Sequence, residues 1–302
     1  MTSTKGPTVG HSGGKVILLG EHAVVHGSYA VAMGIRPGVR VSARREGEDL
    51  VLSIPRWESS FAANDGSREG EAIRQLVCAL GLEPEGMLLE AEFEIPARAG
   101  LGSSAALACA AARAIVSLTD IEMDKIGLFN AIQASERVFH GNPSGLDARV
   151  ALDEGVVLFS RSEGARPITA QPPPLHVFHS GEQGDTYTTV ARFAKRLKET
   201  GDEGASRLLR ISLLVDRGVD ALARGDFEAL GEVMNENQDQ LAWFGMSTPN
   251  LNKIVRTALE AGALGAKLTG GGGGGCAVVL TRSDDTTVAR RVAAAGFEQV
   301  EL

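Results

Sequence analysis

A turn of glycines and serines between Pro96 and Ser104 is the part of this sequence best suited to hold phosphate. It reads Pro-Ala-Arg-Ala-Gly-Leu-Gly-Ser-Ser and runs directly into an alanine-rich segment that is expected to be helical. Glycines let a ligand oxygen approach the backbone, and a helix start presents free N–H groups at the positive end of its dipole. The turn, called here the phosphate loop, therefore predicts a polyphosphate site. The alternative is an ordinary capped helix with Ser103 as its N-cap.

The phosphate loop is not a Walker A motif, because no Gly-Lys-Ser or Gly-Lys-Thr follows its glycines. Without that lysine, a cation or another segment of the chain must complete the neutralisation of phosphate charge. A serine hydroxyl at the helix start is well placed to ligate Mg²⁺, which prefers oxygen ligands.

Two carboxylates, Glu136 and Asp147, stand eleven residues apart. The second one closes the turn Gly141-Asn-Pro-Ser-Gly-Leu-Asp147, which is expected to hold it rigidly. Such a pair can divide the work of phosphoryl transfer: one carboxylate binds Mg²⁺ while the other orients or deprotonates a hydroxyl nucleophile. The alternative for each alone is structural, with Asp147 capping the next segment and Glu136 solvated on a helix.

Lys267-Leu-Thr269 is followed by six consecutive glycines, Gly270 to Gly275, called here the glycine loop, and then by an apolar strand. A loop so poor in side chains costs backbone entropy, which indicates that something approaches its backbone closely. A substrate or the phosphate loop itself is the expected neighbour, and a disordered linker is the alternative.

The bulk composition indicates a globular enzyme rather than a nucleic-acid or membrane protein. The chain has 302 residues, 23% of them charged, with a net charge of −8, which argues against binding to polyanionic surfaces. No apolar run approaches the ~20 residues of a membrane span. The three cysteines show no metal-ligand spacing, so buried free thiols in a reducing cytosol, and a cytoplasmic location, are expected.

Strands and helices are mixed without strict alternation, which favours an α+β fold over a doubly wound sheet. A boundary near the prolines at 172–174 divides the chain into expected domains 1–170 and 171–302. A polar turn is expected at 46–49, between strands. The patterns predict strands at 15–19, 39–43, 50–54, 88–95, 156–159, 175–178 and 276–280. They predict helices at 71–80, 103–118, 125–139, 190–198, 206–223, 227–241, 251–261 and 287–295.

Four segments together resemble the GHMP kinase superfamily and, within it, the mevalonate kinase family. They are Lys15–Gly27, which contains Gly-Glu-His-Ala-Val-Val-His-Gly, together with Pro96–Ala105, Glu136–Asp147 and Lys267–Cys276. The phosphate loop is shared by the whole superfamily. The segments that begin at Gly20 and Glu136 indicate the mevalonate kinases.

The resemblance implies a two-domain fold with a ribosomal-protein-S5-like N-terminal domain and a ferredoxin-like C-terminal domain. It implies ATP-dependent phosphorylation of the primary hydroxyl of mevalonate to 5-phosphomevalonate, in isoprenoid precursor synthesis. ATP and mevalonate are then the partners and Mg²⁺ the metal, and a homodimer is the commonest oligomer.

The resemblance also implies roles for individual residues. The nucleotide is expected on the phosphate loop and the next residue, at Pro96, Gly100, Leu101, Gly102, Ser103, Ser104 and Ala105. Ser104 and Glu136 would ligate Mg²⁺, and Asp147 would be the base or orienting group, with Lys15 beside it. Glu21, His22 and Thr269 would border the acceptor pocket. Arg161 is a candidate cation for the mevalonate carboxylate, with Arg149 and Arg196 as alternatives.

Two other functions stay open at this stage. One is a kinase of the same fold that acts on phosphomevalonate, a sugar or homoserine. The other is a sensor that binds ligands without catalysis, which the loss of Asp147, Glu136 or the loop serines would signal. All of these residues are present.

Overall fold

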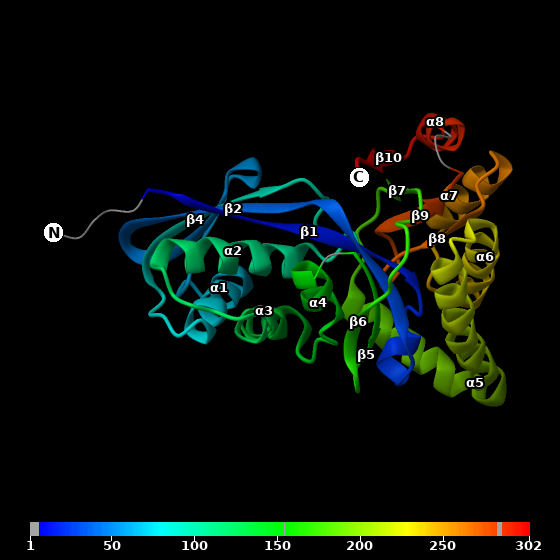
Figure 1. Cartoon of the computed structure of the whole chain (residues 1–302), viewed down its shortest axis with the longest axis horizontal. Coiled ribbons are helices and arrows are strands. Elements are labelled where there is room, and N and C mark those ends of the chain that lie inside the picture. The colour runs from blue at the N-terminus through cyan, green and yellow to red at the C-terminus, as the bar shows by residue number, and fades with distance from the viewer. Residues whose placement is uncertain (1–5, 154, 283–285) are drawn as a thin grey trace. The chain divides into compact units, whose positions relative to one another are not determined.

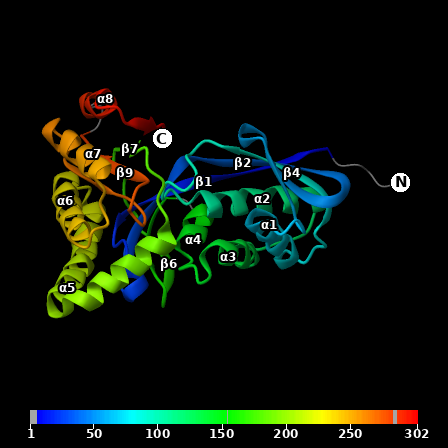
Figure 2. The same cartoon turned by 180° about the vertical axis from the view of Figure 1, so that it is seen from behind.

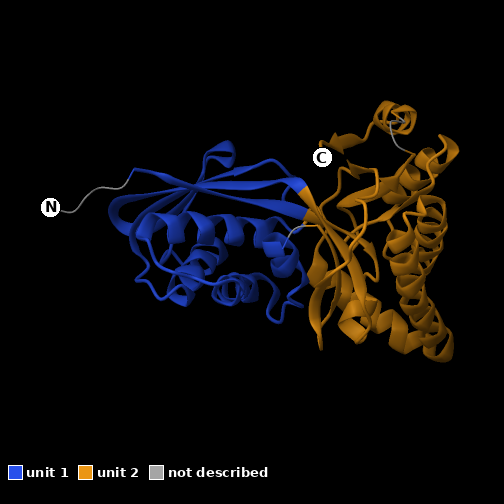
Figure 3. Ribbon diagram, in the orientation of Figure 1, with its two compact units in different colours: residues 1–14, 36–97, 102–154 blue, residues 15–35, 98–101, 155–302 orange. Residues whose placement is uncertain are grey.

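The structure, a computed structural model, describes residues 6–153, 155–282 and 286–302. The chain forms two compact units, which are coloured separately in Figure 3. Unit 1 contains residues 1–14, 36–97 and 102–154, and unit 2 contains residues 15–35, 98–101 and 155–302. Strands β1 (Thr8–Leu19) and β2 (Ala30–Ile54) each contribute residues to both units. The division into domains 1–170 and 171–302 stays a prediction.

In unit 1, helices cover one face of a sheet, as the two opposite views in Figures 1 and 2 show. Strand β2 pairs antiparallel with β3 (Ser59–Ala62) and with β4 (Glu85–Phe93). Alternate residues of these strands, such as Val39, Val41 and Leu89, enter a core shared with the helices. The helices are α1 (Arg68–Ala79), α2 (Ser103–Thr119), α3 (Lys125–His140) and α4 (Leu146–Asp153).

Helix α2 is buried on most of its sides because its residues are small. Seven of its alanines and Cys109 are buried, so neighbouring elements can approach its backbone closely. Helix α3 packs against both α2 and α4. It begins at an N-cap, Asp124, whose side chain accepts a hydrogen bond from the N–H of Gly127. The helices predicted at 103–118 and 125–139 are confirmed, whereas α4 was not predicted.

Unit 2 contains a four-stranded antiparallel sheet with the strand order β10-β7-β9-β8. Its strands are β7 (Leu175–His179), β8 (Gly265–Leu268), β9 (Cys276–Leu280) and β10 (Glu298–Val300). Its helices are α5 (Thr186–Arg224), α6 (Phe227–Trp243), α7 (Pro249–Glu260) and α8 (Thr287–Ala294). Helices lie between β7 and β8 and between β9 and β10, which is the β-α-β-β-α-β succession of a ferredoxin-like domain. The predicted α+β class is confirmed.

Unit 2 also holds β5 (Val156–Ser160) and β6 (Gly164–Pro167), which pair with each other. Strand β5 pairs antiparallel with the first residues of β2, Ala30 to Met33. The two helices predicted at 190–198 and 206–223 are parts of α5, joined at a kink where Gly201 has φ 54° and ψ −126°. Among the described residues, no helix is long and apolar enough to cross a bilayer.

Two predictions are wrong. The turn expected at 46–49 lies inside β2, where the pairing with β4 shifts register between Arg45 and Asp49. The cysteines are free thiols as expected, but only Cys109 and Cys276 are buried, whereas Cys78 is exposed near the end of α1. An apolar sequence neighbourhood does not bury a residue on the outer face of an amphipathic helix.

Candidate active site

The phosphate loop owes its shape to backbone angles that glycine favours. Gly100 and Gly102 have φ of 78° and 71°, and Arg98 takes the same left-handed region with φ 55°. Gly102, not Ser103, is the N-cap of α2, so the capped-helix alternative is wrong in its choice of residue. No side chain bonds the first-turn N–H groups as a cap. The helix start can therefore present these groups to an anion.

Lys15 is fixed against the centre of the phosphate loop, within unit 2. Its Nζ donates a hydrogen bond to the carbonyl of Gly100 at 3.1 Å. Its backbone N–H donates to the carbonyl of Leu101 at 2.9 Å. Because the side chain is 4% exposed, the ammonium lies inside the protein beside this turn. It is a cation of the kind that the missing Walker lysine would otherwise supply.

The glycine loop packs against the same part of the phosphate loop. A Cβ added at Gly100 would lie 2.9 Å from the carbonyl oxygen of Thr269, and one at Gly275 would lie 2.7 Å from that of Ala99. Cys276 donates its N–H to Ala99 at 3.1 Å. The close approach predicted from the run of glycines is confirmed, and its neighbour is the phosphate loop. The alternative of a disordered linker is wrong.

His22 holds the glycine loop from another side. Its Nε2 lies 2.9 Å from the carbonyl oxygen of Gly271, so this nitrogen carries the proton. The ring stacks on Phe193 with centroids 4.6 Å apart. Burial lowers the pKa of His22 from 6.5 to about 4, which makes the ring neutral at physiological pH. Its backbone has φ 61°, a strained value for a residue with a side chain.

Glu21 and Thr269 are buried and bonded inside unit 2. The Glu21 carboxylate forms an ion pair with Lys267, and it accepts a hydrogen bond from Asn237 Nδ2 at 3.1 Å. Thr269 Oγ1 accepts the N–H of Ile17 at 2.7 Å. In the sequence, Lys267 stands out only as the start of a motif, and its pairing with Glu21 cannot be read from the motif. The available signal was a lysine in an otherwise apolar strand.

The proposed magnesium ligands and the proposed base belong to unit 1. Ser104 lies in the first turn of α2, and Glu136 is buried on α3, with Oε2 3.8 Å from His140 Nε2. Asp147 is the second residue of α4 and is half-buried. Because α3 packs against α2 and α4, one helix layer carries all three side chains.

The donor set of unit 1 suits magnesium better than zinc. Ser104 and Glu136 offer a hydroxyl and a carboxylate, which are hard oxygen ligands. Among the described residues, no group of three or more histidine, cysteine, aspartate or glutamate side chains could hold a metal by itself. Mg²⁺ commonly takes one or two protein ligands and completes its shell with phosphate oxygens and water, so these residues fit it.

The three arginines considered for a substrate carboxylate have different surroundings. Arg161 is exposed in the turn after β5. Arg149 lies over the ring of Phe129 at 5.1 Å and forms an ion pair with Asp153. Arg196 lies over the ring of Trp243 at 4.9 Å.

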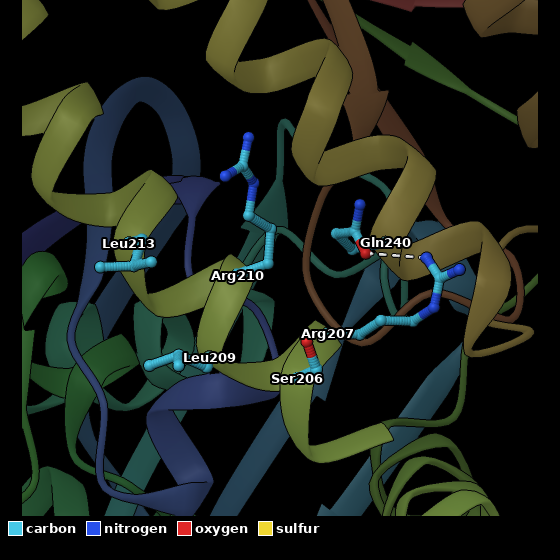
Figure 4. A pocket seen from close by; sticks show the side chains of 6 residues that line it. All are labelled: Ser206, Arg207, Leu209, Arg210, Leu213 and Gln240. Carbon is cyan, nitrogen blue, oxygen red and sulfur yellow. Dashed lines mark hydrogen bonds between the residues drawn. The ribbon is translucent and has the colours of Figure 1, made fainter. Parts of the chain in front are cut away.

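A shallow cavity of about 340 Å³ lies on α5 and α6 (Figure 4). Arg207 Nη1 donates to Gln240 Oε1 at 3.1 Å across it, and Leu209 and Leu213 form its apolar side. None of the residues that line it is a predicted site residue, and the four motif segments lie elsewhere in the chain.

Comparison with known proteins identifies the family. The family model described as GHMP kinases N terminal domain matches residues 69–155, and the one described as GHMP kinases C terminal matches residues 219–298. The mevalonate kinase of Aeropyrum pernix is 30% identical over 271 residues, covering 85% of this chain and 83% of that protein.

Solved structures agree with this match. The L. major mevalonate kinase in complex with R-mevalonate superposes with a TM-score of 0.83 at 28% identity, covering 96% of this chain and 92% of that one. The Methanococcus jannaschii mevalonate kinase shares the fold, with a TM-score of 0.85 at 23% identity over 99% and 97% of the two chains. The chain therefore belongs to the GHMP kinase family and groups there with the mevalonate kinases.

Proposed function

We propose that this protein transfers the γ-phosphoryl group of ATP to the primary hydroxyl of mevalonate. The product is 5-phosphomevalonate, an intermediate of isoprenoid precursor synthesis. The observation that carries the reaction type is the bond from Lys15 Nζ to the carbonyl of Gly100, which holds a buried cation at the phosphate loop. The choice of acceptor is supported by the curated relatives, which are mevalonate kinases.

The phosphate loop is the proposed binding site for the phosphates of ATP. Residues 100–105 combine left-handed glycines with the start of α2, whose N–H groups are not capped by a side chain. Such N–H groups bind phosphate oxygens directly, and the helix dipole favours their negative charge. Pro96, at the start of the loop, fixes the direction in which the chain enters it.

Ser104 and Glu136 are the proposed protein ligands of Mg²⁺. When bound, the ion neutralises charge on the β- and γ-phosphates of ATP. The contribution of this chain is to hold a hydroxyl and a carboxylate on two packed helices, α2 and α3. Helix-borne ligands are held more firmly than loop-borne ones.

Asp147 is the proposed base or orienting group for the acceptor hydroxyl. Its place in the first turn of α4 fixes its backbone, and phosphoryl transfer depends mostly on positioning and charge neutralisation. Lys15 is proposed to stabilise the negative charge that develops on the acceptor oxygen.

The pocket for the phosphoryl acceptor is proposed to be bordered by Glu21, His22, Thr269 and Arg161. His22 is neutral, so its ring can act there as a hydrogen-bonding group rather than as a cation. Glu21 is proposed to act indirectly, because its carboxylate is already bonded to Lys267 and Asn237. Arg161, which is exposed, would meet the mevalonate carboxylate. We further propose a cytoplasmic enzyme, active as a homodimer, without nucleic-acid or membrane partners.

A coupled assay of ADP release tests this function. The purified protein is supplied with ATP, Mg²⁺ and, separately, mevalonate, phosphomevalonate, galactose or homoserine. We expect turnover with mevalonate and less than about 1% of that rate with the other acceptors. Turnover with galactose or homoserine but not with mevalonate would replace the proposed acceptor, and no ADP release with any of them would contradict kinase activity.

A further inference from the structure

A buried lysine, Lys267, makes three bonds at the entrance to the glycine loop. Its side chain is 0% exposed and lies on β8, whose four residues are all buried. Its Nζ donates to Glu21 Oε1, to the carbonyl of Leu268 at 2.7 Å and to the carbonyl of Ile17 at 3.4 Å. An ammonium has three N–H donors, so each of them has an acceptor here.

The partner carboxylate is equally enclosed. Glu21 is 1% exposed, and its second oxygen accepts from Asn237 Nδ2, a residue of α6. Taking two charges out of water costs several kcal/mol for each ion, and an apolar pair of similar volume would often be as stable. Stability alone is therefore a weak reason for placing this pair in the interior.

The two carbonyls held by Lys267 flank functional residues. Ile17 is two residues from Lys15, the cation at the phosphate loop, and Leu268 immediately precedes Thr269. Thr269 Oγ1 bonds both the N–H and the carbonyl of Ile17, at 2.7 and 3.2 Å. Lys267 and Thr269 thus clamp β1 to the strand that enters the glycine loop.

Side chains of α6 also hold β8 in place. Strand β8 is at the edge of its sheet, and α6 supplies partners for its free N–H groups. Asn235 Oδ1 accepts from Ala266, and Gln238 Oε1 accepts from Leu268, both at 2.9 Å. Ala266 and Leu268, on the opposite face of β8 from Lys267, enter a core shared with helices.

We propose that Lys267 is a positioning residue for phosphoryl transfer: through the carbonyls of Ile17 and Leu268 it sets the placement of Lys15 and of the glycine loop. This role rests on the proposed function. Glu21 holds the ammonium in place and balances its charge. A displacement of about 1 Å at a catalytic group can lower a rate about 10²-fold, so loss of the clamp is expected to act on turnover.

Two variants isolate this role from a purely structural one. Glu21→Gln removes the ion pair at constant volume and leaves the ammonium on its two carbonyls. Lys267→Met combined with Glu21→Gln also lacks the ion pair, and in addition it removes the ammonium from the carbonyls of Ile17 and Leu268. Neither variant leaves a buried unpaired carboxylate, as Lys267→Met alone would. In Glu21→Gln the amide oxygen can still accept a hydrogen bond from the ammonium, so we expect both variants to fold. Lys198→Met, at an exposed position of α5, is the matched control.

The experiment measures kcat, both KM values and Tm for all three variants and the wild type. We expect the double variant to have a kcat roughly 10–100-fold below that of Glu21→Gln, with a Tm within about 5 °C of it and a similar KM for ATP. Equal kcat values for the two variants would overturn the positioning role. A parallel fall in kcat and Tm would also overturn it, since the effect would then be structural. A wild type inactive with mevalonate would instead refute the proposed function.

Discussion

The ammonium of Lys15 donates a hydrogen bond to the carbonyl of Gly100, so the cation and the phosphate loop are parts of one hydrogen-bonded arrangement. The backbone N–H of Lys15 bonds the next carbonyl of the loop, that of Leu101. Two adjacent carbonyls are thereby turned toward β1. The N–H groups at the start of α2, which no side chain caps, are then the proposed contacts for an anion.

Replacing Lys15 with methionine removes this charge at nearly constant volume. We expect kcat to fall about 10²-fold or less, the typical cost of one preorganised donor. The KM for ATP should rise at the same time, because Lys15 lies at the proposed phosphate site. Steady-state kinetics with the coupled assay check both values. An unchanged kcat would show that Lys15 serves only to shape the loop.

Replacing Asp147 with asparagine tests the group proposed to act on the acceptor hydroxyl. We expect kcat to fall about 10³-fold, a typical contribution of a general base, and more than in Lys15→Met. The Kd for ATP should stay within about threefold of the wild type, as the phosphate loop is untouched. Titration calorimetry measures that affinity independently of turnover. Near-normal turnover with ATP still bound would remove Asp147 from the reacting centre.

Much of the fold follows from periodicity in the sequence. Helix α2 and strand β9 were predicted to within two residues, because long apolar or alternating patterns leave little choice. Short elements were missed, among them β8 and α4. The first contains a lysine and a glycine, and the second follows a Pro-Ser-Gly turn. Tertiary contacts, rather than local preference, decide whether such short segments form a strand or a helix.

The candidate site also has features that the sequence predicts and features that it does not. Motif spacing identified the phosphate loop and the glycine loop, and their close approach followed from the absence of side chains. It did not reveal that Lys267 pairs with Glu21, because the two are 246 residues apart and each alone is typical of a surface. Nor did it predict that Gly102 rather than Ser103 caps α2, which depends on a backbone angle.

His22 should make the protein sensitive to acid. Burial lowers its pKa in the folded state to about 4, whereas in the unfolded chain it stays near 6.5. Between these values the unfolded state binds a proton that the folded state does not, so stability falls as pH falls from 6.5 to 4. The gap between the two values corresponds to on the order of 3 kcal/mol.

Urea unfolding at pH 7 and pH 4.5 measures this effect. In His22→Gln the side-chain amide can still donate to Gly271 but does not titrate. The wild type should therefore lose about 2–3 kcal/mol more than the variant between the two pH values. Identical losses would mean that His22 is not the group that responds to acid.

Gly100→Ala tests whether the close packing of the two loops matters for turnover. The added Cβ would lie 2.9 Å from the carbonyl oxygen of Thr269, a distance that real Cβ atoms essentially never show, so the loops must separate. Its φ of 78° adds strain of about 1–2 kcal/mol for any residue with a side chain. Gly225→Ala is the control, since it shares a positive φ of 65° but has no heavy atom within 4 Å of the added Cβ.

Both glycine variants should lose a similar amount of stability from backbone strain, measured by urea unfolding. Only Gly100→Ala should also lose turnover, by roughly 10–100-fold, because Gly100 bonds Lys15 and precedes the N–H groups proposed to bind phosphate. The KM for ATP should rise in that variant and stay constant in Gly225→Ala. If both variants kept wild-type kcat, the contact between the phosphate loop and the glycine loop would be a packing feature without influence on catalysis.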